Sequence, residues 1–148
     1  PQAQAISEQA MLFEEFLARE AAAGQLESLK VRLQASDHAI LLHGHCHQKA
    51  FGAISPVMDV LKLIPGAKPE LIESSCCGMA GSFGYEARHY EVSMQMAELS
   101  LLPAVRSQPD AIVVADGTSC RHQIHDGAQR EAVHVAVLLA RQLGAAQP

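Results

Sequence analysis

Cysteines are the residues of this sequence best suited to chemistry, because thiolates bind soft metal ions and iron–sulfur clusters. The chain has four of them, and each follows a short apolar run where a strand would end: Cys46, Cys76, Cys77 and Cys120. The carboxyl ends of parallel strands lie at one edge of an open sheet, where ligands bind. The sequence therefore predicts that all four thiols meet in one metal or cluster site.

Histidines accompany these cysteines. His43, His45 and His47 alternate around Cys46, and His122 follows the last cysteine by two residues. A neutral imidazole ligates zinc or iron, and a protonated one donates to a cluster sulfur. We expect His45, His47 and His122 to support a metal centre or to provide a fourth ligand. The alternative is that one or two of these histidines cap the helix that follows.

Glycines follow the adjacent cysteines, at positions 78, 81 and 84. Glycine permits unusual backbone angles and a close approach of the backbone to a bound group. We therefore expect Gly78 to contact a cofactor.

The remaining elements must position these residues. Buried apolar runs predict strands at residues 38–43, 70–74 and 111–115. Apolar residues at helical spacing predict helical segments at residues 7–33, 48–63, 88–105 and 120–143, with interruptions near Gly24 and Gly127. This alternation predicts an α/β fold, with an open parallel sheet of three to four strands, helices on both faces and cysteines at the C-terminal strand ends.

The length of 148 residues fits a single domain. We expect residues 1–148 to form one cysteine-rich domain, with a helical segment at 1–35 and a frayed tail at 144–148. Since the first residue is Pro1 rather than Met, we interpret the chain as a piece cut from a longer protein.

Composition excludes several classes of protein. Apolar residues make up 49% and charged residues 18%, which is typical of a globular chain. The net charge of −5 argues against a nucleic-acid partner, and no apolar stretch approaches the roughly 20 residues of a membrane helix. Adjacent cysteines disfavour a disulfide framework, so we expect a cytoplasmic protein with reduced thiols.

The motifs at residues 43–50, 76–86 and 117–124 carry a resemblance to a known family. They resemble the cysteine-rich CCG domain, found in heterodisulfide reductase and in the iron–sulfur subunits of glycolate oxidase and anaerobic glycerol-3-phosphate dehydrogenase. That family's pattern is a cysteine, then Cys-Cys-Gly, then CxxC, each after a strand. The resemblance covers most of the chain, from about His38 to Leu143.

These motifs are most similar to the C-terminal end of large FAD-linked oxidases, such as D-lactate, glycolate and D-2-hydroxyglutarate dehydrogenases. The resemblance implies an electron-transfer domain that receives electrons from FAD. It implies a 4Fe–4S cluster or zinc, ligated by Cys46, Cys76, Cys77 and Cys120. It also implies flavin and ferredoxin-like domains of the same polypeptide as partners, and an isolated fragment that does not turn over substrate.

One departure from the family leaves alternatives open. Gly117 stands where the family has the first cysteine of CxxC, so the site has fewer thiolates than the family pattern. A zinc-stabilised structural or docking module without electron transfer is therefore the second hypothesis. A thiol switch using Cys76 and Cys77 is the third. The sequence leaves open the substrate, the electron acceptor and the oligomeric state, with a homo-oligomer among the options.

Overall fold

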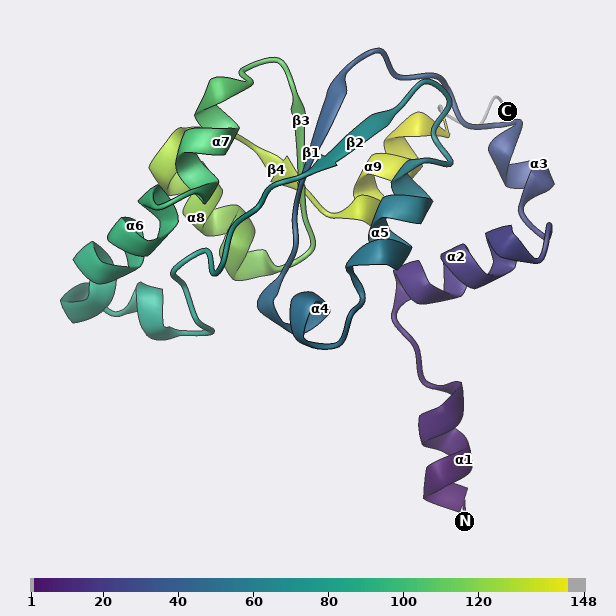
Figure 1. Cartoon of the computed structure of the whole chain (residues 1–148), viewed down its shortest axis with the longest axis horizontal. Coiled ribbons are helices and arrows are strands. Elements are labelled where there is room, and N and C mark those ends of the chain that lie inside the picture. Colours follow the sequence, from purple (N-terminus) through teal and green to yellow (C-terminus); the bar gives the residue numbers. More distant parts are fainter. Residues whose placement is uncertain (1, 144–148) are drawn as a thin grey trace.

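A four-stranded, all-parallel sheet forms the centre of the fold in the computed structural model, which describes residues 2–143 (Figure 1). Its strands are β1 (Ala39–His43), β2 (Lys68–Leu71), β3 (Ile112–Ala115) and β4 (Ala132–Val133). They lie in the order β2-β1-β3-β4, so β1 and β3 occupy the middle. The register pairs His43 at the end of β1 with Ala115 at the end of β3. The parallel α/β fold predicted from the sequence is confirmed.

Helices cover both faces of the sheet (Figure 1). The α-helices of the described chain are α1 (Gln2–Gln9), α2 (Phe13–Ala22), α3 (Glu27–Lys30), α4 (Cys46–Ala50), α5 (Ile54–Leu61), α6 (Tyr90–Glu98), α7 (Leu101–Ser107), α8 (Thr118–Ala128) and α9 (Val135–Gln142). Short 3₁₀ turns, η1 (Phe83–Tyr85) and η2 (Ala87–His89), precede α6. Helix α1 stands away from the body and has no buried residue.

The period-two alternation of β1 divides the core into two parts. Ile40 and Leu42 point to the face covered by α2, α5 and α9. Leu41 points to the opposite face, which is covered by α7 and α8. His43 is two residues beyond Leu41 and fully buried, so alternation places its side chain on the α8 face. That face also holds Cys77 and Cys120.

The predicted helical segment at 120–143 is interrupted just after Gly127, as expected, but the interruption contains a strand that was not predicted. Helix α8 ends at Gln129, which adopts a left-handed conformation with φ 53° as the C-cap. The chain then forms β4, and α9 begins after His134, whose imidazole accepts the Ala136 N–H as an N-cap. A two-residue strand is too short to be recognised from alternation.

Four other predicted segments also differ in part from the structure. The segment 7–33 has the expected interruption near Gly24, between α2 and α3, and a second, unexpected one between α1 and α2. The segment 88–105 is divided into α6 and α7. The segment 48–63 is divided at Gly52, which has φ +69°. Strand β2 begins at Lys68 rather than residue 70 and includes Pro69, which the sheet tolerates because β2 is an edge strand.

The predicted frayed tail at 144–148 lies outside the described residues. Within residues 2–143, no helix combines the length and the apolar character needed to cross a bilayer.

Candidate metal centre

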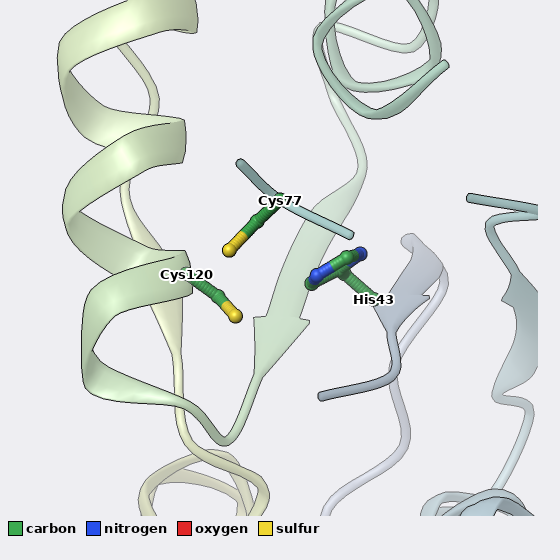
Figure 2. A group of neighbouring side chains, drawn as sticks. All are labelled: His43, Cys77 and Cys120. Atoms are coloured by element: carbon green, nitrogen blue, oxygen red, sulfur yellow. The ribbon is translucent and has the colours of Figure 1, made fainter. Parts of the chain in front are cut away.

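Three buried side chains converge at the C-terminal edge of the sheet (Figure 2). His43 ends β1, Cys77 lies in the loop after β2, and Cys120 lies in the first turn of α8. One ligand atom from each lies within 4.8 Å of the other two. These elements are far apart in sequence, and the parallel sheet brings them together because all its strands end at the same edge.

His43 presents one free nitrogen in this group. Its Nδ1 lies 2.9 Å from Ser74 Oγ, which fixes the ring. Its Nε2 is fully buried and has no hydrogen-bond partner within residues 2–143. Burying an unpaired polar atom costs free energy, about 1–3 kcal/mol in proteins. A metal ion bound by Nε2 would remove this cost, with Ser74 holding the ring from the other side.

The two buried thiols shift each other's pKa in opposite directions. The neighbouring Cys120 thiol lowers the pKa of Cys77, against the opposing effect of burial, and His43 lowers it further. The same contact with Cys77 raises the pKa of Cys120, and burial raises it too. The contact therefore favours one thiolate and one thiol in this pair, and a metal ion bound there would displace the remaining proton.

The other two cysteines form a second pair nearer the surface. Cys46 Sγ lies 3.7 Å from Cys76 Sγ and donates to it. Cys46 is exposed and Cys76 is half-buried. Partial burial of its sulfur raises the pKa of Cys46, and the hydrogen bond with Cys76 raises it further. The Gly78 N–H donates to Cys76 Sγ at 3.3 Å, which holds this sulfur beside the turn.

The loop that carries Cys76 and Cys77 is held from two sides. The Lys49 ammonium donates to the carbonyl of Ser74 and, at 2.7 Å, to the carbonyl of Ser75. Its positive charge also lowers the pKa of Cys46 and so opposes the larger upward shift. On the other side, Gly78 has φ +91°, and a Cβ at this position would overlap the carbonyl oxygen of Ser93.

That carbonyl belongs to α6 and is fixed by a buried side chain of α8. Gln123 Nε2 donates to Ser93 O and to Ser93 Oγ, both at 3.0 Å. Gly78 therefore has a packing role that its sequence position did not reveal. Its predicted contact with a cofactor stays a prediction.

The predicted histidines lie around this centre in different ways. Strand β1 ends at His43, so His45 and His47 do not continue its extended face. His45 is the N-cap of α4, where its Nδ1 accepts the His47 N–H at 3.3 Å. The rings of these two histidines meet edge to face with centroids 5.2 Å apart. The capping alternative is thus confirmed for His45, and roles in cofactor binding stay predictions.

His122 lies elsewhere on α8. Its Nδ1 is 2.7 Å from the Tyr85 hydroxyl, and its ring packs edge to face against the Tyr85 ring.

His43 is one of the three alternating histidines of the sequence, but the sequence favoured His45, His47 and His122 as site residues. Alternation could have placed it on the same face as Leu41, but only with knowledge that the strand ends at His43. If the strand had continued, His45 and His47 would have shared the same face as His43.

Fold and site together define a parallel α/β domain that gathers thiols and an imidazole at its strand ends. Comparison with curated proteins finds relatives among dehydrogenases. A subunit of anaerobic glycerol-3-phosphate dehydrogenase from Escherichia coli (strain K12) is 29% identical over 104 residues, which are 70% of this chain and 26% of that protein. D-2-hydroxyglutarate dehydrogenase of the same strain is 35% identical over 122 residues, or 81% of this chain and 12% of that protein.

D-2-hydroxyglutarate dehydrogenase of Pantoea ananatis is 42% identical over 59 residues, which are 40% of this chain. The chain therefore spans 26% or less of the length of these relatives. No family model matches the chain. No solved structure gives a significant match either.

The residues present fit a metal centre. Two thiols and an imidazole supply three of the four donors of a tetrahedral zinc site, and thiolates hold iron–sulfur clusters. The decisive observation is the buried Nε2 of His43, which has no partner within the described residues and lies in a group with two sulfurs.

Proposed function

We propose that this chain is the iron–sulfur or metal-binding redox domain of a flavin-dependent 2-hydroxy acid dehydrogenase. In this proposal the domain passes on electrons that come from FAD elsewhere in the same polypeptide. The observation that carries it is the buried group of His43, Cys77 and Cys120, within 4.8 Å of one another. The dehydrogenase relatives support the redox assignment, and the name D-2-hydroxyglutarate dehydrogenase supports the substrate class.

Each residue of the site has a part in this proposal. The centre would be held on its buried side by Cys77, Cys120 and His43. On its solvent side it would be completed by Cys46 and Cys76. An iron–sulfur cluster held there would supply reversible one-electron transfer. The buried side chains exclude water, since Cys77 and Cys120 are 2% and 1% exposed. Lys49 anchors the cysteine loop and places a positive charge near Cys46, where it would stabilise a metal-bound thiolate.

A second candidate is a zinc-stabilised structural or docking module without electron transfer. It is favoured by the close spacing of the three buried ligand atoms, which suits a single ion, and by the position of Cys46 and Cys76 outside that group. In this case the two surface thiols would remain free.

Anaerobic metal analysis separates the two candidates. The chain is purified without oxygen, reconstituted with iron and sulfide or with zinc, and assayed for metal, acid-labile sulfide and visible absorption. Iron with sulfide and a chromophore that dithionite reduces reversibly would support the redox domain. One zinc per chain without a reducible chromophore would support the structural module, and a chain that takes up no metal would overturn both.

Two variants locate the centre. His43→Gln and Cys77→Ser should each lower the metal content, because each removes a buried ligand. His38→Gln removes an exposed histidine at the other end of β1 and is the matched control. Metal content that is unchanged in His43→Gln would contradict the role given to Nε2.

A further inference from the structure

A second group of metal-ligating side chains lies outside the thiol centre. Glu14 of α2, Asp116 in the loop after β3 and His134 before α9 each offer an atom within 4.8 Å of the other two. All three line a cavity of about 1010 Å³ that opens between the N-terminal segment and the strand ends. No other part of the proposed function uses them.

The burial of the Glu14 carboxylate is the observation that points to a bound cation. It is 4% exposed, yet within residues 2–143 its carboxylate accepts no hydrogen bond from the side chain or backbone of another residue. The only hydrogen bond to its carboxylate comes from its own backbone N–H, and the nearest other donor, His134 Nε2, is 3.9 Å away. Burial raises the pKa of Glu14, and the negative charge of Asp116 contributes to the rise. A buried carboxylate beside a second carboxylate is stabilised by a cation.

The contacts among the three residues are not those of a hydrogen-bonded network. His134 Nδ1 accepts the Ala136 N–H at 3.1 Å, so in this arrangement it carries no proton. Its separation of 3.6 Å from Asp116 Oδ1 therefore joins two acceptors. On the other side of the ring, His134 Nε2 lies 3.9 Å from Glu14 Oε1, beyond hydrogen-bond distance.

Asp116 is fixed in place by its other bonds. Its Oδ2 accepts from Gln48 Nε2 at 2.6 Å, and its Oδ1 accepts from the Val135 N–H at 2.9 Å. Each carboxylate oxygen retains a second lone pair for another partner. The oxygen ligand is therefore preorganised by α4 and α9.

We propose that Glu14, Asp116 and His134 bind a divalent cation in this cavity, as a site separate from the thiol centre. Two carboxylates and one imidazole suit first-row ions such as Mn²⁺ and Zn²⁺. Binding at His134 Nδ1 replaces the Ala136 N–H. Binding at Nε2 moves the ring proton to Nδ1, so the Ala136 N–H loses this acceptor and the Nδ1–H faces Asp116 Oδ1 at 3.6 Å. The ring stays neutral in both cases.

Mn²⁺ is the probe that distinguishes this site from the thiols, since it prefers oxygen ligands and binds thiolates weakly. The chain is stripped with a chelator and titrated with Mn²⁺ while the free ion is followed by its EPR signal. We expect one Mn²⁺ per chain. Glu14→Gln and His134→Gln should each weaken binding by about tenfold or more.

Two controls keep the result specific. Glu15→Gln removes the same charge from the next residue, which lines the same cavity, and should bind Mn²⁺ as the wild type does. Cys77→Ser should also bind normally, so that failure of the thiol centre and failure of this site are distinguishable. No Mn²⁺ binding, or equal binding in Glu14→Gln, would overturn the proposal.

A measurement on the unmutated chain covers the case in which a variant does not fold. Bound Mn²⁺ should broaden the NMR signals of the His134 ring and of the Glu14 and Val135 amides. The amide of Lys68, at the opposite end of the sheet, should be unaffected. Broadening centred on other residues would equally overturn the assignment.

Discussion

The imidazole of His45 occupies the space that a side chain at residue 117 would need. A Cβ built on Gly117 would collide with His45 Cδ2 and would lie 3.0 Å from Cys120 Sγ. The backbone of Gly117, with φ −68° and ψ 125°, is acceptable for any residue. Glycine is therefore required here by its neighbour and not by its conformation. In the family that the sequence resembles, a cysteine stands at this position.

This relationship predicts a rescue. Gly117→Ala should displace the His45 ring and remove the N-cap of α4, lowering the free energy of unfolding by about 1–2 kcal/mol. His45→Ser keeps a capping oxygen and makes space, so Gly117→Ala in that background should cost much less. Urea denaturation of the two single variants and the double variant measures the coupling. Additive effects would show that the ring does not control residue 117.

Gly78 and Gly81 provide a matched pair for the cysteine loop. Both have positive φ, of 91° and 69°, but a Cβ on Gly78 overlaps the Ser93 carbonyl, whereas a Cβ on Gly81 meets open space. Gly81→Ala should cost about 1 kcal/mol, the conformational penalty alone. Gly78→Ala should cost clearly more and should also lower metal uptake, because the loop must move. Thermal unfolding and metal analysis test this, and equal losses would contradict the packing role.

The surface thiols predict where the metal-free chain oxidises. With Sγ atoms 3.7 Å apart, Cys46 and Cys76 should form a disulfide when treated with diamide. The two thiols lose two electrons and two protons to the diamide, which is reduced to the hydrazine. Peptide mapping by mass spectrometry should find the 46–76 bond, and Cys46→Ser should abolish it.

A disulfide between the buried thiols is the result that would contradict this prediction. Cys77 and Cys120 also lie close together but are shielded from solvent, so they should react slowly. A map dominated by Cys77 linked to Cys120 would show that the loop opens readily.

Arg106 and Glu98 predict a pH dependence away from the site. Arg106 holds both carboxylate oxygens of Glu98, at 2.8 and 2.7 Å, and this contact lowers the pKa of Glu98 from 4.5. A carboxyl group whose pKa is lower in the folded state adds stability above its unfolded pKa and loses it as pH falls through the folded pKa. Glu98→Gln should therefore be less stable than wild type at neutral pH and equal to it in acid.

Solvent exposure keeps this effect small and sensitive to salt. Both side chains are nearly half-exposed, so the difference should shrink in high salt. Arg106→Gln removes the partner, so in that background Glu98→Gln should have little further effect, and this pair of variants is the control. Urea denaturation at several pH values provides the measurement.

The sequence predicted the fold and the edge of the sheet because both follow from short-range patterns. Buried apolar runs identified β1 and β3, and the positions of Cys77 and Cys120 after strands placed them at one edge. The pairing of Cys46 with Cys76 could not be predicted from the sequence, because it depends on the turn at Gly78. The choice of His43 required knowing the residue at which β1 ends.

The grouping of Glu14, Asp116 and His134 could not be predicted from the sequence, for a different reason. Helix α2 packs on α5, and this long-range contact brings Glu14 to the loop after β3. No local sequence pattern predicts that a glutamate in an amphipathic helix will be buried. Likewise, β4 is too short to produce a signal, although it sets the start of α9 and the position of His134.

The position of His43 would couple the binding of the proposed metal ion to the stability of the fold. His43 belongs to β1, which pairs with a strand on each side. An ion bound by its imidazole would therefore restrain the middle of the sheet. The binding free energy of that ion is then added to the free energy of folding. Loss of the proposed ion would then raise the unfolded fraction of the chain, which is the state that proteases cleave.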